Sequence, residues 1–199
     1  NNFEFGKNAI KKLTHRGPDK NLILSKNNNY FFLGVNILSL TRDDDKNITS
    51  DEFFSGDRYI IAFNGEIYNF RALSKEYNIH EYKSDTDLIS KLLQHVNIQK
   101  LFKIIDGMYS IIIIDLHESN AYFKRDLIGE KRLYYYDHNN TFAVSSEVSH
   151  LKSLNLTTTL NVSTLKNYFF TRHLMPFYNT CYNEIKDFEP GKLYKYEFK

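Results

Sequence analysis

An apolar strand that runs into an Asn-Gly pair constrains this chain more than any other feature. Arg58-Tyr59-Ile60-Ile61 is β-branched and aromatic, which predicts a buried strand. Asn64-Gly65 follows, and because this pair tolerates positive φ it predicts that the strand stops there in a sharp turn. A second interpretation is an oxyanion hole, since the Asn64 amide and the Gly65 N–H would be two donors at one point.

The pattern along the rest of the chain predicts an α+β fold. Helical periodicity alternates with antiparallel hairpins rather than with parallel crossovers, which favours two stacked sheets with helices outside them. The helices expected are one near residues 9–13, one over 69–77, one after Ser84 or Asp85, one over 101–105, one from Ser146 to Leu154 and one starting at Asn161. The further strands expected are 30–40, 108–114, 121–124 and a hairpin of 133–136 with 141–144 around Asn139-Asn140.

Composition excludes several classes of function. The net charge is +2 and Lys and Arg are scattered, so we expect no nucleic-acid partner. No apolar run approaches the ~18 residues of a membrane span. A basic and then apolar leader is not seen at the start, so we expect a cytoplasmic protein.

Metal and thiol chemistry also find little support. The single Cys181 excludes an internal disulfide and a multi-cysteine zinc site, and we interpret it as structural. The seven His residues lack paired ligand spacing, so no metal site is expected. We assign the acidic run Asp43-Asp44-Asp45 to a solvated loop rather than to a cation site.

Further motifs lie around the central stretch at characteristic spacing. They are His15-Arg16-Gly17-Pro18-Asp19, Ser84-Asp85-Thr86-Asp87, Asp106-Gly107-Met108, Arg125-Asp126-Leu127-Ile128-Gly129-Glu130-Lys131, Leu133-Tyr134-Tyr135 and Ser145-Ser146-Glu147. With Phe63-Asn64-Gly65-Glu66-Ile67-Tyr68-Asn69-Phe70 they resemble the class II glutamine amidotransferase domain of glutamine-dependent asparagine synthetases. The resemblance extends from Leu13 onward and implies the four-layer αββα sandwich of N-terminal-nucleophile hydrolases.

The resemblance also implies roles for individual residues. Asn64 and Gly65 match the oxyanion-hole pair, which favours that interpretation over a plain turn. Glu66 and Asp85 match residues that hold the head group of glutamine, Asp85 through the α-ammonium group. For Asp85 a helix N-cap is the alternative, and Ser84 could do the capping instead. Arg16, Asp19, Arg125, Asp126 and Lys131 match charges that fix loops.

Two departures from the family pattern leave the activity open. The family nucleophile is an N-terminal cysteine, and this sequence begins at Asn1 without one. Ile37 stands where the family has an Arg that binds the carboxylate of glutamine, and isoleucine offers no donor; Arg42 could reach in from the following loop. The chain is therefore expected to be either a glutaminase domain that releases ammonia for ATP-dependent amidation, or a degenerate scaffold without that activity.

The resemblance implies two parts. Residues 1–155 correspond to the amidotransferase domain, and residues 156–199 to a connector toward an ATP-dependent synthetase domain that these residues do not include. No glycine-rich phosphate loop occurs in them, so ATP and Mg are expected only in the synthetase domain and no cofactor in this one. The partners expected are glutamine and the synthetase domain, and a homodimer is left open.

Overall fold

The computed structural model describes residues 11–12, 14–16, 20–26, 31–37, 57–173 and 178–198. The elements in order are η1 (Thr14–Arg16), β1 (Lys20–Lys26), β2 (Phe31–Ile37), β3 (Tyr59–Ile67), α3 (Phe70–Glu76), α4 (Asp85–Leu92), α5 (Ile98–Ile104), β4 (Gly107–Asp115), β5 (Asn120–Arg125), β6 (Tyr134–His138), β7 (Thr141–Ser145), α6 (Val148–Ser153), α7 (Val162–Thr171), β8 (Ile185–Asp187) and β9 (Leu193–Glu197).

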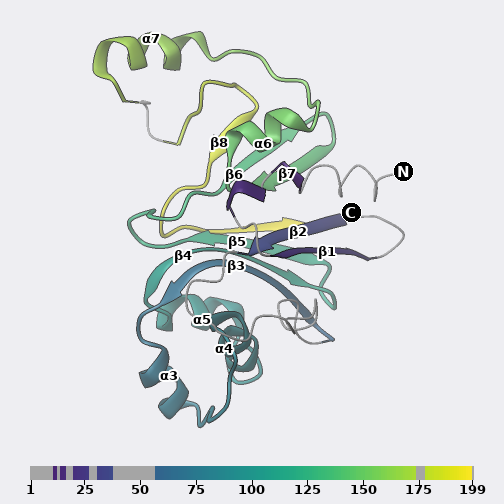
Figure 1. Ribbon diagram of the computed structural model, residues 1–199, viewed down its shortest axis with the longest axis vertical. Coiled ribbons are helices and arrows are strands. Elements are labelled where there is room, and N and C mark those ends of the chain that lie inside the picture. Colours follow the sequence, from purple (N-terminus) through teal and green to yellow (C-terminus); the bar gives the residue numbers. More distant parts are fainter. Residues whose placement is uncertain are drawn as a thin grey trace.

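The layers follow the order helices, sheet, sheet, helix (Figure 1). One antiparallel sheet has the strand order β3-β4-β5-β9 and a second has the order β7-β6-β8, while β1 and β2 form a separate hairpin. The helices α3, α4 and α5 cover the outer face of the first sheet, and α6 covers the second (Figure 1). The expected α+β class and αββα sandwich are confirmed.

Alternating burial along β3 and β4 separates two hydrophobic cores. Ile61 and Ile67 of β3 pack with Ile111 and Ile113 of β4 against the three helices. The intervening residues face the second sheet, where Ile60 and Ala62 join a core that contains Phe123, Leu133 and Phe188. Side chains alternate sides along each strand, so the helices bury one face of the sheet and the second sheet buries the other.

Several local predictions are confirmed by the capping and turn geometry. The Ser84 side chain caps α4 by accepting from Asp87 N at 3.1 Å, and Asn161 caps α7 by accepting from Thr164 N at 3.0 Å. Asn139 and Asn140 have φ of 51° and 56°, the conformation of a tight hairpin turn between β6 and β7.

Two local predictions are wrong. The strand does not stop at Asn64-Gly65: β3 continues to Ile67 because β4 pairs with it along its whole length. Ser146 does not cap α6, whose N-cap position is Glu147. Ser145 Oγ instead accepts from Glu147 N at 3.2 Å and lies 2.9 Å from His150 Nδ1.

The expected connector contributes to both sheets. Within residues 156–199, β8 pairs with β6 and β9 pairs with β5, so both sheets are completed by this segment. The strand β1 was not among the strands expected from the sequence. The expected helix near residues 9–13 falls mostly outside the described residues, and the acidic loop and Arg42 fall outside them entirely.

Candidate functional site

The free edge of β3 brings the predicted site residues together. β3 is the edge strand of its sheet, with β4 on one side and no described strand on the other. Asn64 and Gly65 lie opposite Ser110 and Tyr109 of β4. What these groups can do depends on which way their backbone donors point.

The backbone of Tyr109 is engaged on the β5 side. Its carbonyl accepts from Asp126 N at 2.8 Å, and its N–H donates to Asp126 Oδ2 at 3.3 Å. In an antiparallel ladder both polar groups of a residue point to the same neighbour, so Gly65 and Tyr109 form a pair without hydrogen bonds between them. The Gly65 N–H therefore points away from β4, toward the free edge.

Asp85 occupies the same edge. Its Oδ2 accepts from the backbone N of Ile67 at 3.1 Å. Ile67 is two residues beyond Gly65, and the two outward N–H groups are about 7 Å apart along a strand that rises about 3.4 Å per residue. The carboxylate of Asp85 and the N–H of Gly65 thus belong to one local surface, built from two separate sequence motifs.

The glycine is required by a close approach of β4. Gly65 has φ of 153°, and a Cβ there would lie 2.0 Å from the carbonyl oxygen of Met108. Gly107 mirrors it, since a Cβ at Gly107 would lie 2.1 Å from the carbonyl oxygen of Glu66. Glycine at position 65 is therefore required by strand pairing within a sheet rather than by the predicted turn.

Asn64 and Glu66 lie on the opposite face of β3 from Ile61 and Ile67. By strand alternation they share the side of Ile60 and Ala62, toward the second sheet. Asn64 is half-buried and Glu66 is exposed.

The alternative role for Asp85 as a helix cap is wrong, because the side chain of Ser84 caps α4.

The loop that follows β5 is bonded to Tyr109 of β4, on the side of β4 that faces away from β3. Asp126 is buried and accepts from the backbone N–H groups of Ile128, Glu130 and Lys131 as well as that of Tyr109. Burial by itself would raise the pKa of Asp126, but these hydrogen bonds outweigh it and hold the pKa below its ordinary value. Burial, with a smaller contribution from Asp126, raises the pKa of Tyr109 to about 12.

Arg125 connects the loop to the second sheet. Its guanidinium donates to Asp187 Oδ1 at 2.7 Å and to carbonyl oxygens of Phe188, Gly129 and Lys131. The sequence assigned Arg125 and Asp126 to the framework, and these contacts confirm that assignment. It missed Asp187, for which no motif gave a signal.

The carboxylate-anchor position is described only in its backbone. Ile37 ends β2 and pairs with Lys20 of β1, and its side chain lies outside what the structure describes. Cys181 is half-buried and its thiol is free. Its backbone carbonyl accepts a hydrogen bond from Asn161 N at 2.9 Å.

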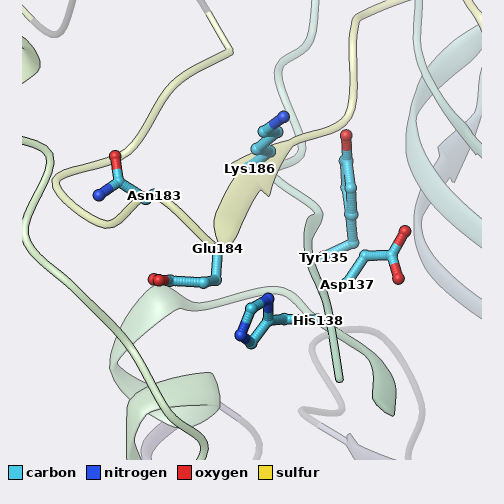
Figure 2. Close-up of a pocket in the computed structure, with 6 residues that line it drawn as sticks. All are labelled: Tyr135, Asp137, His138, Asn183, Glu184 and Lys186. Atoms are coloured by element: carbon cyan, nitrogen blue, oxygen red, sulfur yellow. The ribbon is translucent and has the colours of Figure 1, made fainter. Parts of the chain in front are cut away.

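An open depression lies away from these residues. It has a volume of about 340 Å³ over β6 and β8 and is lined by Tyr135, Asp137, His138, Asn183, Glu184 and Lys186 (Figure 2). Glu184 is already engaged there, since it accepts from Thr159 N at 2.8 Å and from Thr159 Oγ1 at 2.7 Å. The depression contains none of the predicted site residues.

Two other features are absent from the part of the chain that the structure describes. Within the described ranges, no three His, Cys, Asp or Glu side chains are grouped so as to hold a metal ion. Across the same ranges, no helix is long and apolar enough to cross a lipid bilayer.

Comparison with known proteins gives a consistent result. A family model described as a glutamine amidotransferase domain matches residues 3–199. A protein of Methanocaldococcus jannaschii named "Putative asparagine synthetase (glutamine-hydrolyzing) 2" is 30% identical over 92% of this chain and 41% of its own length. "Asparagine synthetase (glutamine-hydrolyzing) 1" of Bacillus subtilis is 27% identical over 96% of this chain and 30% of its own length.

The fold has a solved counterpart. Glutamine phosphoribosylpyrophosphate amidotransferase of B. subtilis superimposes with a TM-score of 0.61 at 14% identity, over 96% of this chain and 45% of that one. The chain thus spans less than half the length of the relatives it matches. Because the family model covers nearly all of its residues, the chain belongs to the glutamine amidotransferase domain family, in the form carried by asparagine-synthetase-like proteins.

Proposed function

We propose that this domain is the glutaminase half of an asparagine-synthetase-like protein of the cytoplasm, releasing ammonia from glutamine for an ATP-dependent amidation. One observation carries the proposal: the Gly65 N–H and the Asp85 carboxylate lie on the same free edge of β3. A donor for the amide oxygen and an acceptor for the α-ammonium group are two of the features that a glutamine site needs.

Each residue has a defined task in this proposal. The Asn64 amide and the Gly65 N–H donate to the side-chain carbonyl oxygen of glutamine as it gains negative charge. Asp85 and Glu66 bind the α-ammonium group; a carboxylate accepts several hydrogen bonds, so the bond from Ile67 leaves Asp85 further capacity. The nucleophile would be the N-terminal cysteine of the family, and no cofactor is needed in this domain.

Ile37 favours a second candidate function. Without the family's arginine, the carboxylate of a bound glutamine would lack its cation, and an unpaired buried carboxylate is costly. A degenerate domain of this kind would retain the sandwich and cover a synthetase partner without hydrolysing glutamine.

Calorimetry with glutamine separates the two. The glutaminase proposal expects a saturable heat for the chain, and at least a tenfold weaker affinity for Asp85→Asn, because a charge-assisted hydrogen bond contributes about 1.5–3 kcal/mol. The scaffold proposal expects no saturable heat for the chain and recovery of binding in Ile37→Arg. The N-terminal sequence and mass of the natural polypeptide would then show whether a cysteine begins it.

A further inference from the structure

Exposed apolar side chains are concentrated around α7. Of the nine large hydrophobic residues that are exposed in the described part of the chain, six lie between residues 160 and 178. Phe169 and Phe170 are the most exposed of these six, at 72% and 88%. The other four are Leu160, Val162, Tyr168 and Tyr178. Clustering of this kind marks an interaction surface, whereas single exposed apolar residues do not.

Among the described residues, the apolar stripe of α7 remains exposed. Val162, Leu165, Phe169 and Phe170 follow the i, i+3, i+7, i+8 spacing of one broad helix face, and Tyr168 lies at its border. Thr164 is the one residue of α7 that is buried. Figure 1 shows α7 projecting from the top of the molecule, beyond α6 and away from both sheets.

The base of α7 is held firmly, so the stripe is presented in a fixed place. Asn161 caps the helix, and its backbone N donates to Cys181 O at 2.9 Å. Just before it, Thr159 accepts from Asn183 N at 3.0 Å and donates to Glu184. These bonds join the start of α7 to the segment that leads into β8.

The area of this surface limits which partner can cover it. A ten-residue helix is about 15 Å long and 10 Å wide, so one face offers a few hundred Å² at most. A stable complex of separate molecules buries about 800 Å² on each partner. A second copy held by α7 alone falls short of that, whereas a domain tethered in the same polypeptide gains a high effective concentration and needs less area.

We infer that the apolar face of α7 docks against an ATP-dependent synthetase domain of the same polypeptide. The inference rests on the proposed function and names the surface through which the two halves meet. Its basis is the exposed stripe, its limited area, and the length of the relatives, of which this chain covers 41% and 30%. α7 also lies in the segment 156–199 that the sequence assigned to a connector toward such a domain.

Hydroxyl-radical footprinting tests this directly. We would compare the 199-residue chain with the natural full-length polypeptide and follow oxidation of Phe169 and Phe170. Docking predicts at least a tenfold slower oxidation of both rings in the longer protein. Leu127 and Ile128, exposed at 84% and 76% on another loop, are the internal reference. Equal rates for the two phenylalanines, or a natural polypeptide without a synthetase domain, would overturn the inference.

A variant pair supplies the second measurement. Phe169→Ser/Phe170→Ser removes two exposed rings, so the 199-residue chain should keep its stability. In the full-length protein, calorimetry should show one coupled unfolding transition in the wild type and two separated transitions in this variant. Leu127→Ser/Ile128→Ser is the matched control and should leave the single transition intact; splitting by the control alone would refute docking through α7.

Two other partners for the apolar face of α7, a second copy of the chain and a lipid surface, would give different results. Sedimentation equilibrium of the 199-residue chain should show no self-association that Phe169→Ser/Phe170→Ser abolishes, and vesicles of anionic phospholipid should not bind it through these rings. Either finding would overturn the inference in favour of a second copy or a lipid surface. Glutamine calorimetry reports on the β3 edge alone, so failure of the proposed function is distinguishable from failure of docking.

Discussion

Asp85 at the start of α4 accepts a hydrogen bond from the backbone N–H of Ile67 at the end of β3, with Oδ2 3.1 Å from the nitrogen. The two residues belong to motifs separated in sequence, and this bond fixes the beginning of the helix against the edge of the sheet. It places a carboxylate on the same strand edge as the outward-facing N–H of Gly65, two residues along the strand. The candidate site is therefore created by the docking of one helix on one edge strand.

Asp85→Ala should separate the local roles of this helix start. We expect a loss of about 1–2 kcal/mol in the free energy of unfolding, because Ile67 N–H loses its acceptor. Ser84→Ala should cost about 1 kcal/mol through the lost cap. In glutamine calorimetry only Asp85→Ala should lower affinity, and an equal loss in both variants would contradict a direct role for the carboxylate.

Gly65→Ala should destabilise the whole domain. The new Cβ would lie 2.0 Å from Met108 O, and β4 cannot retreat because it is paired with β5 on its other side. We expect a loss of about 3 kcal/mol or more, measured by urea unfolding. The neighbouring exposed Glu66→Ala should change stability by less than about 0.5 kcal/mol, and similar effects of the two substitutions would refute the close approach of the strands.

Asp126→Asn should alter the dependence of stability on pH. The pKa of Asp126 is held below that of the unfolded state, about 3.9, so the folded protein binds fewer protons. Its stabilising contribution is fully present above a pH of about 4 and is lost as the pH falls through the lower pKa that Asp126 has in the folded state.

The asparagine variant should lack that part of the acid-induced loss and be less stable by about 2–3 kcal/mol at neutral pH. Urea unfolding as a function of pH measures both effects. The exposed Asp106→Asn is the control; an unchanged pH profile in Asp126→Asn would show that the hydrogen bonds to Asp126 do not set its ionisation.

Asp187→Ala should be more harmful than Arg132→Ala. Asp187 contacts both arginines, but Arg125 is fully buried whereas Arg132 is largely exposed. Removing the carboxylate leaves the Arg125 charge buried without its counter-ion, for which we expect a cost of about 3–5 kcal/mol. Arg132→Ala should have a small effect. Thermal unfolding of the two variants gives the comparison, and the reverse order would contradict this account.

Local signals in the sequence were sufficient for most of the helices and strands. Helix caps at Ser84 and Asn161 and the Asn139-Asn140 turn were found because each depends on a few adjacent residues. The prediction of a turn at Asn64-Gly65 was wrong because the same dipeptide also suits an edge strand with a close neighbour. Which of the two occurs depends on β4, which starts more than forty residues later.

The candidate site divides in the same way. The sequence by itself determined the family and the fold class and proposed Asn64, Gly65, Glu66 and Asp85 as site residues, because these inferences rest on motif order and side-chain chemistry. Only the tertiary structure decided that the Gly65 N–H points to a free edge and that Asp85 lies on that edge. Those facts depend on strand register and on the pairing of Tyr109 with Asp126, which are long-range contacts that no local pattern specifies.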